Sequence, residues 1–399
     1  MLFTKRNAAR AAAAAGSVTL LSLGLMACAP SSGGAAPESD GENEAVELGI
    51  SDEDYSLDKL IEAAKEEGPI VVSDSTGKIV DIAEAFSEKY GLDATGVKVK
   101  AGEAAEIAIR ESEADNVKTD LLIFSDSPAA KGELLERGIV SSWTPPDLAD
   151  KFDPEMTDPQ VVTTSVMVWA YNAELYPDGC PIDNVWAVTD EDWRGHVTFE
   201  DPTLEVQILY WVNQMAENDD DALKDAYEEY FGEEFSSDED SAAAEWLKRL
   251  AQNEPVLTKG DDEAAAAAGA PGQKEAFMAL LSTAKFRDNA DSGYKLGMCE
   301  HVAPYSGIGY NKLGLIANGT KNPNTAKLFL HYMLTEEGIS LQVEDGKFSA
   351  NNDVEPAPDE PSGIADIWDE VYQPNKDTQI SDYEKLPDWS DFWIANNHS

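Results

Sequence analysis

The chain has 399 residues, enough for two domains of ordinary size, and its 29 basic and 77 acidic residues give a formal net charge of −48. A field of that sign repels nucleic acid and anionic membrane surfaces, so the charge argues against both as partners. The acidic residues are spread along the chain, which indicates a solvated acidic surface and leaves the partner unidentified.

The first 28 residues have the pattern of an export signal. Lys5, Arg6 and Arg10 form a positively charged start, and residues 11–27 are apolar and small. That apolar stretch has the length of a signal core and is short for a membrane span, which needs ~20 residues. We therefore predict an exported protein.

The signal ends in the letters LMAC, residues 25–28, which resemble the bacterial lipobox. In a lipobox the chain is cleaved before the cysteine, whose thiol then carries lipid. We predict lipidation at Cys28 and anchoring at the outer face of the cell membrane, at the cell surface or in the periplasm. An ordinary secretory signal is the alternative. Residues 29–50 are rich in Ser, Gly, Ala, Pro and Glu and are predicted to form a disordered tether.

From Leu57 onward the pattern alternates between helix and strand. Apolar residues at helical spacing stop before Gly68 and Gly91, and residues 121–124 are continuously apolar, as in a strand covered on both faces. This alternation predicts an α/β fold with a mostly parallel sheet and helices on both sides. The expected elements of this region are a helix at 57–64, a strand at 70–72, a helix at 79–90, a strand at 97–100, a helix at 104–114, a strand at 120–124 and a helix at 129–137.

The rest of the chain contains further predicted elements. The Ala-rich stretch 261–270 is predicted to form a helix that begins at its two aspartates, because alanine has the highest helix propensity and aspartate favours a helix start. The aromatic residues of the tail after Ala350 are predicted to pack it onto the body. The other expected elements are strands at 166–171, 197–199 and 312–317 and helices at 204–216, 221–230, 242–251 and 325–334.

Short polar loops follow the predicted strands or precede the predicted helices. They are residues 73–77, 125–128, 201–203 and 258–262. Open α/β sheets bind ligands at the carboxyl ends of their strands, where hydroxyls and the free N–H groups of helix starts can hold a polar or anionic group. Each Ser, Thr or Asp taken singly is better explained as a helix N-cap, whereas four such loops at equivalent places favour a shared cleft.

The sequence contains none of the common catalytic or metal-binding motifs. G-x-S-x-G, H-E-x-x-H, C-x-x-C, the P-loop and G-x-G-x-x-G are all missing, and the four histidines are scattered. We therefore expect no enzyme, no cofactor and no metal. Cys180 and Cys299 are the cysteines that remain after Cys28, and in an oxidising compartment they favour a disulfide over two free thiols.

Six stretches, taken together, resemble the substrate-binding proteins of ABC importers, in the ferric-iron-type branch of the periplasmic-binding-protein superfamily. They occur in the order of that family and cover most of residues 55–345. The stretches are LIEAAKEEGPIVVSDSTGK (60–78), IAEAFSEKYG (82–91), TDLLIFSD (119–126), WAYNAELYP (169–177), WRGHVTFEDPT (193–203) and APYSGIGYNKLGLIANGTKNPNTAKLFLHYMLTEEG (303–338).

The resemblance implies a two-lobed α/β fold with the ligand in a cleft between hinge-linked lobes. It places crossing strands near 166–171 and 302–308, lobe one at 51–166 plus 305–399, and lobe two at 167–304. It also implies a function: capture of a small polar or anionic solute by lobe closure and delivery to an ABC permease, with ATP hydrolysis left to the ATPase partner.

The nature of the solute is less constrained. Ferric-binding members use a pair of adjacent tyrosines, which this sequence lacks, so bare Fe³⁺ is disfavoured. Lys285 and Arg287 suit a phosphate or carboxylate, unless they are solvated, whereas Asp74 and Asp126 suit hydroxyls or an amine. A solute with an anionic end and a hydroxyl or amino end fits best. A ferric-iron-binding protein, a surface enzyme and a sensory or adhesive lipoprotein remain alternatives. The residues expected at the ligand are Ser73, Asp74, Ser75, Thr76, Gly77, Ser125, Asp126, Asp201, Thr203, Lys285, Arg287, Tyr305 and Ser306.

Overall fold

The computed structural model describes residues 48–397, which belong to one compact unit. The predictions for the export signal, for Cys28 and for nearly all of the tether lie outside these residues. None of the helices in the described part is long and apolar enough to cross a membrane.

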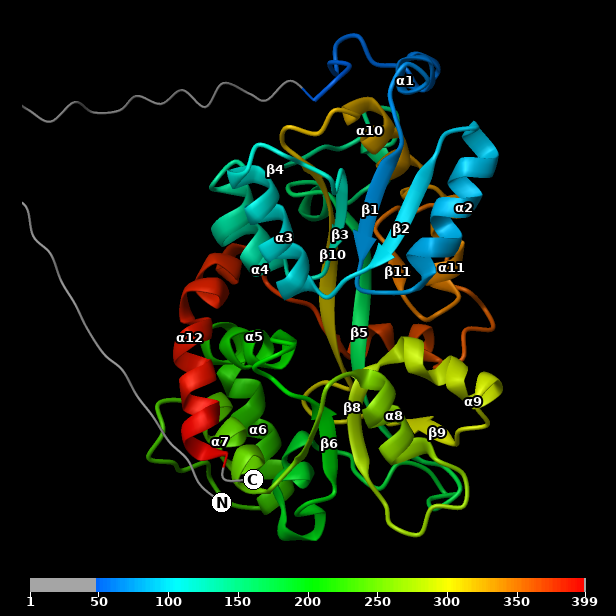
Figure 1. Cartoon of the computed structure of the whole chain (residues 1–399). Helices are drawn as coiled ribbons and strands as arrows, with labels where there is room; N and C mark the ends of the chain where they lie inside the picture. Colours follow the sequence, from blue (N-terminus) through cyan, green and yellow to red (C-terminus); the bar gives the residue numbers. More distant parts are fainter. Residues whose placement is uncertain (1–47, 398–399) are drawn as a thin grey trace, which may run out of the picture. The chain divides into compact units, whose positions relative to one another are not determined.

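Twelve strands form one mixed sheet, whose main path runs β2-β1-β3-β10-β5-β8-β6-β7 (Figure 1). Strands β1 to β3 are parallel to one another, as are β6 to β8, while β10 and β5 run antiparallel to their neighbours on this path. The strands are β1 Ile70–Asp74, β2 Ala94–Lys98, β3 Leu121–Phe124, β4 Val140–Ser142, β5 Val161–Asn172, β6 Val197–Glu200, β7 Val256–Thr258, β8 Met278–Ser282, β9 Leu296–Met298, β10 Gly307–Ala317, β11 Phe348–Ser349 and β12 Val371–Tyr372.

Helices connect these strands, and their ends follow local sequence. Ser56 caps the first helix by accepting a hydrogen bond from Lys59 N, and Gly91 ends the second in the left-handed conformation that glycine allows. The principal α-helices are α1 Leu57–Ala64, α2 Lys78–Tyr90, α3 Ala101–Glu113, α4 Ser127–Ala129, α5 Gln207–Gln214, α6 Asp220–Phe231, α7 Ala242–Gln252, α8 Asp261–Gly269, α9 Asp288–Asp291, α10 Pro323–Met333, α11 Glu336–Val343 and α12 Gln379–Asn396.

The apolar core falls into two large clusters joined by a smaller one. The first cluster is built around the sheet β1–β3 and includes Phe86, Phe124 and Phe329. The second lies around β6 and includes Trp186 and Trp246. We call the half of the molecule around the first cluster lobe one and the half around the second lobe two.

Two long strands run from one lobe into the other. The first half of β5 pairs with β10 and β11, and its second half pairs with β8 and β9 of lobe two. Strand β10 in turn reaches β3 and β4 of lobe one. The predicted two-lobed α/β fold with crossing strands is confirmed; the return strand β10 begins at Gly307, near the end of the segment 302–308 expected for it, and continues to Ala317.

The C-terminal tail is not confined to lobe one, as assigning 305–399 to that lobe required. Tyr372 and Trp393 belong to the cluster of lobe two, and α12 packs on α5 and α7 of that lobe as well as on α4 of lobe one. The reason is hydrophobic burial, because the Trp393 ring finds apolar surface beside Phe199. Lobe two also contains the disulfide that the sequence favoured, between Cys180 and Cys299.

Candidate functional site

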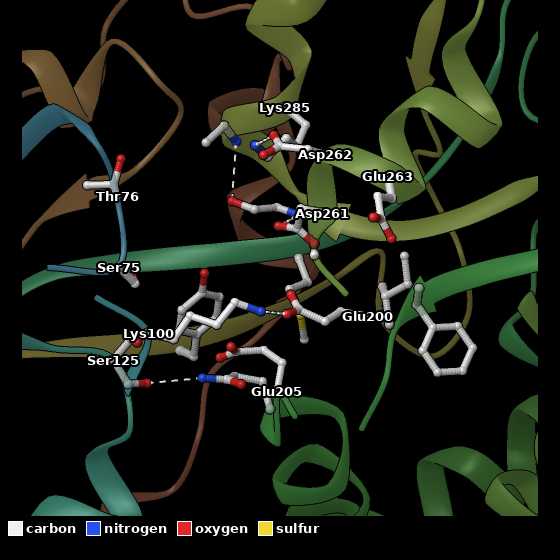
Figure 2. A pocket seen from close by; sticks show the side chains of 18 of the residues that line it. Ser75, Thr76, Lys100, Ser125, Glu200, Glu205, Asp261, Asp262, Glu263 and Lys285 are labelled. Carbon is white, nitrogen blue, oxygen red and sulfur yellow. Dashed lines mark hydrogen bonds and ion pairs between the residues drawn. The ribbon is translucent and has the colours of Figure 1, made fainter. Parts of the chain in front are cut away.

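A cavity of about 380 Å³ is lined by residues of both lobes, at the carboxyl ends of β1, β2, β3 and β6 (Figure 2). Lobe one contributes the loop between β1 and α2, the end of β2 and Ser125. Lobe two contributes the loop after β6, the start of α8 and the segment after β8. Charged and polar residues of this lining are Ser75, Thr76, Lys98, Lys100, Ser125, Glu200, Glu205, Gln207, Lys259, Asp261, Asp262, Glu263, Ser282, Lys285, Arg287, Tyr310, Lys312 and Lys347.

Six of the residues predicted from the sequence line this cavity. They are Ser75, Thr76, Gly77, Ser125, Lys285 and Arg287. Their places follow from the topology: β1 and β3 are parallel neighbours, so the loops that leave their carboxyl ends open onto the same edge of the sheet.

Asp74, in contrast, does not line the cavity, and Lys312 compensates the charge of its carboxylate. It is 1% exposed, and its Oδ1 accepts a hydrogen bond from Lys312 Nζ at 2.6 Å while its Oδ2 accepts one from Gln342 Nε2 at 3.0 Å. A carboxylate with a cation and an amide as partners is a structural group, and it does not present a free charge to a ligand. Its neighbour Ser73 lines a separate hollow between α3 and the sheet.

Local hydrogen bonds hold three further predicted site residues, Asp126, Asp201 and Thr203. Asp126 caps α4 by accepting a hydrogen bond from Ala129 N at 2.9 Å. Asp201 accepts hydrogen bonds from the backbone and the hydroxyl of Thr203, at 2.9 and 2.8 Å. Asp126 is therefore the helix N-cap that the alternative described, whereas Asp201 stabilises the turn after β6, since α5 begins only at Gln207.

Tyr305 and Ser306 lie in the loop before β10, and neither lines the cavity. The Tyr305 hydroxyl donates to Asp219, and its ring packs against Tyr372. Ser306 donates to Glu370 Oε2 at 2.5 Å. Both side chains thus connect lobe two to the C-terminal tail.

Basic side chains that the sequence analysis missed line the lobe-one side of the cavity. Lys312 comes from the crossing strand β10 and also donates to Ser75 Oγ at 2.8 Å. Lys347 is 3% exposed, and its Nζ donates to Gln342 Oε1 at 2.9 Å. Burial, together with the nearby charge of Lys312, lowers the pKa of Lys347 to about 7.

Acidic side chains face the cavity from lobe two. Burial, and next the charge of Glu200, raises the pKa of Glu205 to about 7. Burial raises the pKa of Asp261 as well. Glu200 itself forms an ion pair with Lys100 of lobe one, and Lys100 Nζ also donates to the backbone oxygen of Lys259 at 2.7 Å. Lys100 therefore bridges the two lobes across the cavity (Figure 2).

Sequence signals for the missed residues were uneven. A lysine inside the apolar strand of residues 312–317 needs a buried partner, so Lys312 could have been recognised. Lys100 is the last residue of a predicted strand, and the loop of residues 73–77 likewise follows the end of a predicted strand. Glu205 and Lys347 carry no local signal, because the fold alone brings them to the cavity. Within residues 48–397, no group of three or more His, Cys, Asp or Glu side chains is placed to hold a metal ion.

The matched family model spans residues 70–346 and is described as bacterial extracellular solute-binding protein. The chain belongs to this family. Its members are binding proteins that act outside the cytoplasm, which agrees with the function inferred from the resemblance. No curated protein sequence matches the chain.

Solved structures share the fold at low sequence identity. Iron-bound HitA from Pseudomonas aeruginosa has a TM-score of 0.62 and 17% identity, over 82% of this chain and 99% of that one. AfuA from Actinobacillus pleuropneumoniae, with fructose-6-phosphate bound, has a TM-score of 0.62 and 18% identity, over 83% and 98%. A substrate-binding protein of an ABC transporter from Agrobacterium tumefaciens has a TM-score of 0.64 and 12% identity, over 85% and 97%. The two-lobed fold of periplasmic binding proteins is thereby established.

Proposed function

We propose that this solute-binding protein captures a small polar or anionic solute in the cavity between its lobes and delivers it to an ABC permease by lobe closure. The observation that carries the proposal is that both lobes line one cavity while β5 and β10 connect them. A solute that contacts both walls stabilises the closed arrangement in proportion to its preference for it. The permease then recognises that arrangement.

The side chains at the cavity support solute binding without turnover better than they support catalysis by a serine hydrolase. Ser75 Oγ lies 2.8 Å from Lys312 Nζ, a contact that a serine hydrolase with a lysine base also has. Here, however, Lys312 forms an ion pair with Asp74, at 2.6 Å. A lysine held as the cation of an ion pair has no free lone pair to accept the serine proton.

Export and lipid anchoring through Cys28 are part of the same proposal, since a permease needs its binding protein nearby. A Cys28→Ser variant should lose incorporation of labelled fatty acid and appear in the soluble fraction outside the cytoplasm. Unchanged labelling of this variant would show that Cys28 is not the lipidated residue.

Thermal denaturation with a panel of small solutes tests the proposed function. The panel contains sugars, hexose phosphates, phosphonates, amino acids, polyamines and ferric citrate. A bound solute at 100 times its Kd stabilises the protein by about 2.7 kcal/mol, and the stabilisation grows with the logarithm of concentration. Isothermal titration then gives the stoichiometry, and unchanged solute after incubation shows the lack of turnover. A panel without any stabilising solute would count against the proposal.

A further inference from the structure

The cavity carries opposite charges on two sides. On one side Lys312, Lys347 and Arg287 lie with the first turn of α2. On the other side lie Glu200, Glu205 and Asp261. We call these the basic wall and the acidic wall.

The basic wall has more positive charge than its own carboxylates compensate. Asp74 pairs with Lys312, and Asp345 pairs with Arg287. Lys347 is left with a neutral amide as its hydrogen-bond acceptor, although it is buried. A buried ammonium with no carboxylate of its own is costly, and a bound anion would remove that cost.

The start of α2 adds to the basic wall. This helix has 13 residues, and its N-cap is Gly77, which has no side chain to cap the helix. Thr76 Oγ1 accepts a hydrogen bond from Lys78 N at 3.4 Å, and the Ser75 and Thr76 hydroxyls lie at the cavity (Figure 2). The positive end of the helix dipole and the two hydroxyls together favour an anionic ligand group.

The acidic wall shows the reverse imbalance. Glu200 pairs with Lys100, but the side-chain carboxylate of Glu205 has no hydrogen bond or ion pair within the described residues. Asp261 accepts a hydrogen bond from Ser282 N at 3.2 Å, and no ion pair compensates it in that part of the chain. Two carboxylates thus face the cavity without an ion-pair partner, although the charges of Lys285 and Lys100 act on Asp261 and that of Lys100 acts on Glu205.

An unpartnered acceptor lies next to this wall. Gln207 is 5% exposed and lines the cavity. Its Nε2 donates to the backbone oxygen of Ser125 at 3.2 Å, whereas its Oε1 is buried without any hydrogen-bond partner. A buried acceptor needs a donor, which an ammonium group would supply to it and to Glu205 together.

We infer that the solute is a zwitterion, with its anionic group at Lys347, Lys312 and the start of α2 and its ammonium group at Glu205, Asp261 and Gln207. This inference rests on the proposed function and specifies its solute class. A solute with only a negative charge would leave the acidic wall uncompensated, and a solute with only a positive charge would leave the basic wall uncompensated. A zwitterion satisfies both walls without adding net charge.

The pH dependence of Glu205 sets the acid side of the expected binding profile. Burial and the charges of Glu200, Asp261 and Asp126 raise its pKa, to about 7, and Lys100 opposes them. Below that pH the carboxyl group is protonated and attracts an ammonium group less.

Lys347 sets the alkaline side. Burial and the charges of Lys312 and Arg287 lower its pKa, to about 7, while Asp74 and Asp345 oppose the shift. Above that pH its amine is neutral and attracts an anion less. Zwitterion affinity should therefore pass through a maximum near neutral pH, whereas the affinity of an anion without the amine should only fall as the pH rises.

The test compares ω-amino alkanesulfonates of two to six carbons with the matching alkanesulfonates and alkylamines, by isothermal titration on the purified chain. Sulfonate stays ionised throughout, so that the profile reports the protein. We expect the best zwitterion to bind at least ten times more tightly than either matched analogue. Equal or tighter binding of the alkanesulfonate would overturn the inference.

Two variants locate the walls. Glu205→Gln should weaken zwitterion binding about tenfold and leave alkanesulfonate binding unchanged or stronger, which also shows that the variant is folded. Lys347→Met should weaken both. Glu84→Gln and Lys274→Met are exposed substitutions of the same kinds and should change neither. If Glu205→Gln binds the zwitterion as the parent does, the assignment of the ammonium group is wrong.

The outcomes separate this inference from the proposed function. If no ω-amino sulfonate and no amino acid binds while another solute of the broad panel does, the zwitterion inference fails and the binding function stands. If nothing in either set binds, both fail.

Discussion

Replacing Lys312 by methionine is expected to lower the free energy of unfolding by about 3–5 kcal/mol, because it leaves a buried carboxylate without its cation. Lys312 and Asp74 are 2% and 1% exposed, and Nζ lies 2.6 Å from Oδ1. After the substitution Asp74 keeps hydrogen bonds from Gln342 Nε2, Thr76 N and Ser75 Oγ, at 3.0, 3.3 and 3.4 Å. Three neutral donors compensate a charge only in part where water is excluded.

Urea unfolding followed by tryptophan fluorescence measures this loss. The midpoint should fall while the denaturant slope stays the same, since the substitution changes stability and not the surface exposed on unfolding. Adding Asp74→Asn to Lys312→Met removes the stranded charge and should recover at least half of the loss. The difference from additivity then gives the coupling between the two side chains.

Arg194→Met is the matched control, because Arg194 pairs with Glu254 where both side chains are about half exposed. Exposed ion pairs contribute little, so its midpoint should stay near that of the parent. If Lys312→Met is no more destabilising than this control, then Asp74 is hydrated or protonated. That result would also refute the claim that Asp74 compensates the charge of Lys312 in the basic wall.

Further expectations concern other buried groups. Burial raises the pKa of Asp126 to about 6, so the protein should lose stability as the pH rises through 6 and this carboxyl group ionises. The Asp126→Asn variant cannot ionise there, so its free energy of unfolding should fall by up to about 3 kcal/mol less between pH 4 and pH 8, as measured by urea unfolding. Replacing both Cys180 and Cys299 by serine opens a link over a sequence separation of 119 and should destabilise the protein by about 2–5 kcal/mol, unless the bond is absent in the purified protein. Trp393→Ala leaves a void in lobe two and should cost about 3–5 kcal/mol in the same assay; a cost below 1 kcal/mol would mean that α12 is not docked there.

Local patterns predicted much of the fold because they depend on near neighbours in the chain. The strand at 121–124 was visible as a continuous apolar run, and α2 ends at the glycine expected to stop it. Ser75 and Ser125 reach the same cavity for a reason available from sequence, since loops after parallel strands share one edge of the sheet. In these cases a short-range pattern and one topological rule were sufficient.

Long-range placement was not predictable in the same way. The cavity receives Lys312 because β10 crosses between the lobes antiparallel to β3, and it receives Lys347 because β11, which follows directly, pairs with β5. Trp393 packs on lobe two although its sequence neighbours gave no preference for either lobe. Asp74 resembled a ligand residue in sequence, and only its pairing with Lys312 reveals that it is a structural group.

The charge of the whole chain bears on the solute as well. The chain has 29 basic and 77 acidic residues, yet the cavity is lined by seven basic side chains, Lys98, Lys100, Lys259, Lys285, Arg287, Lys312 and Lys347, and by five acidic ones, Glu200, Glu205, Asp261, Asp262 and Glu263. The field of a strongly negative protein opposes the approach of an anion and attracts cations to the whole surface. A zwitterion has no net charge for that field to act on, so it approaches without this opposition. Only inside the cavity, where the basic wall and the acidic wall lie apart, do its two charges find separate partners.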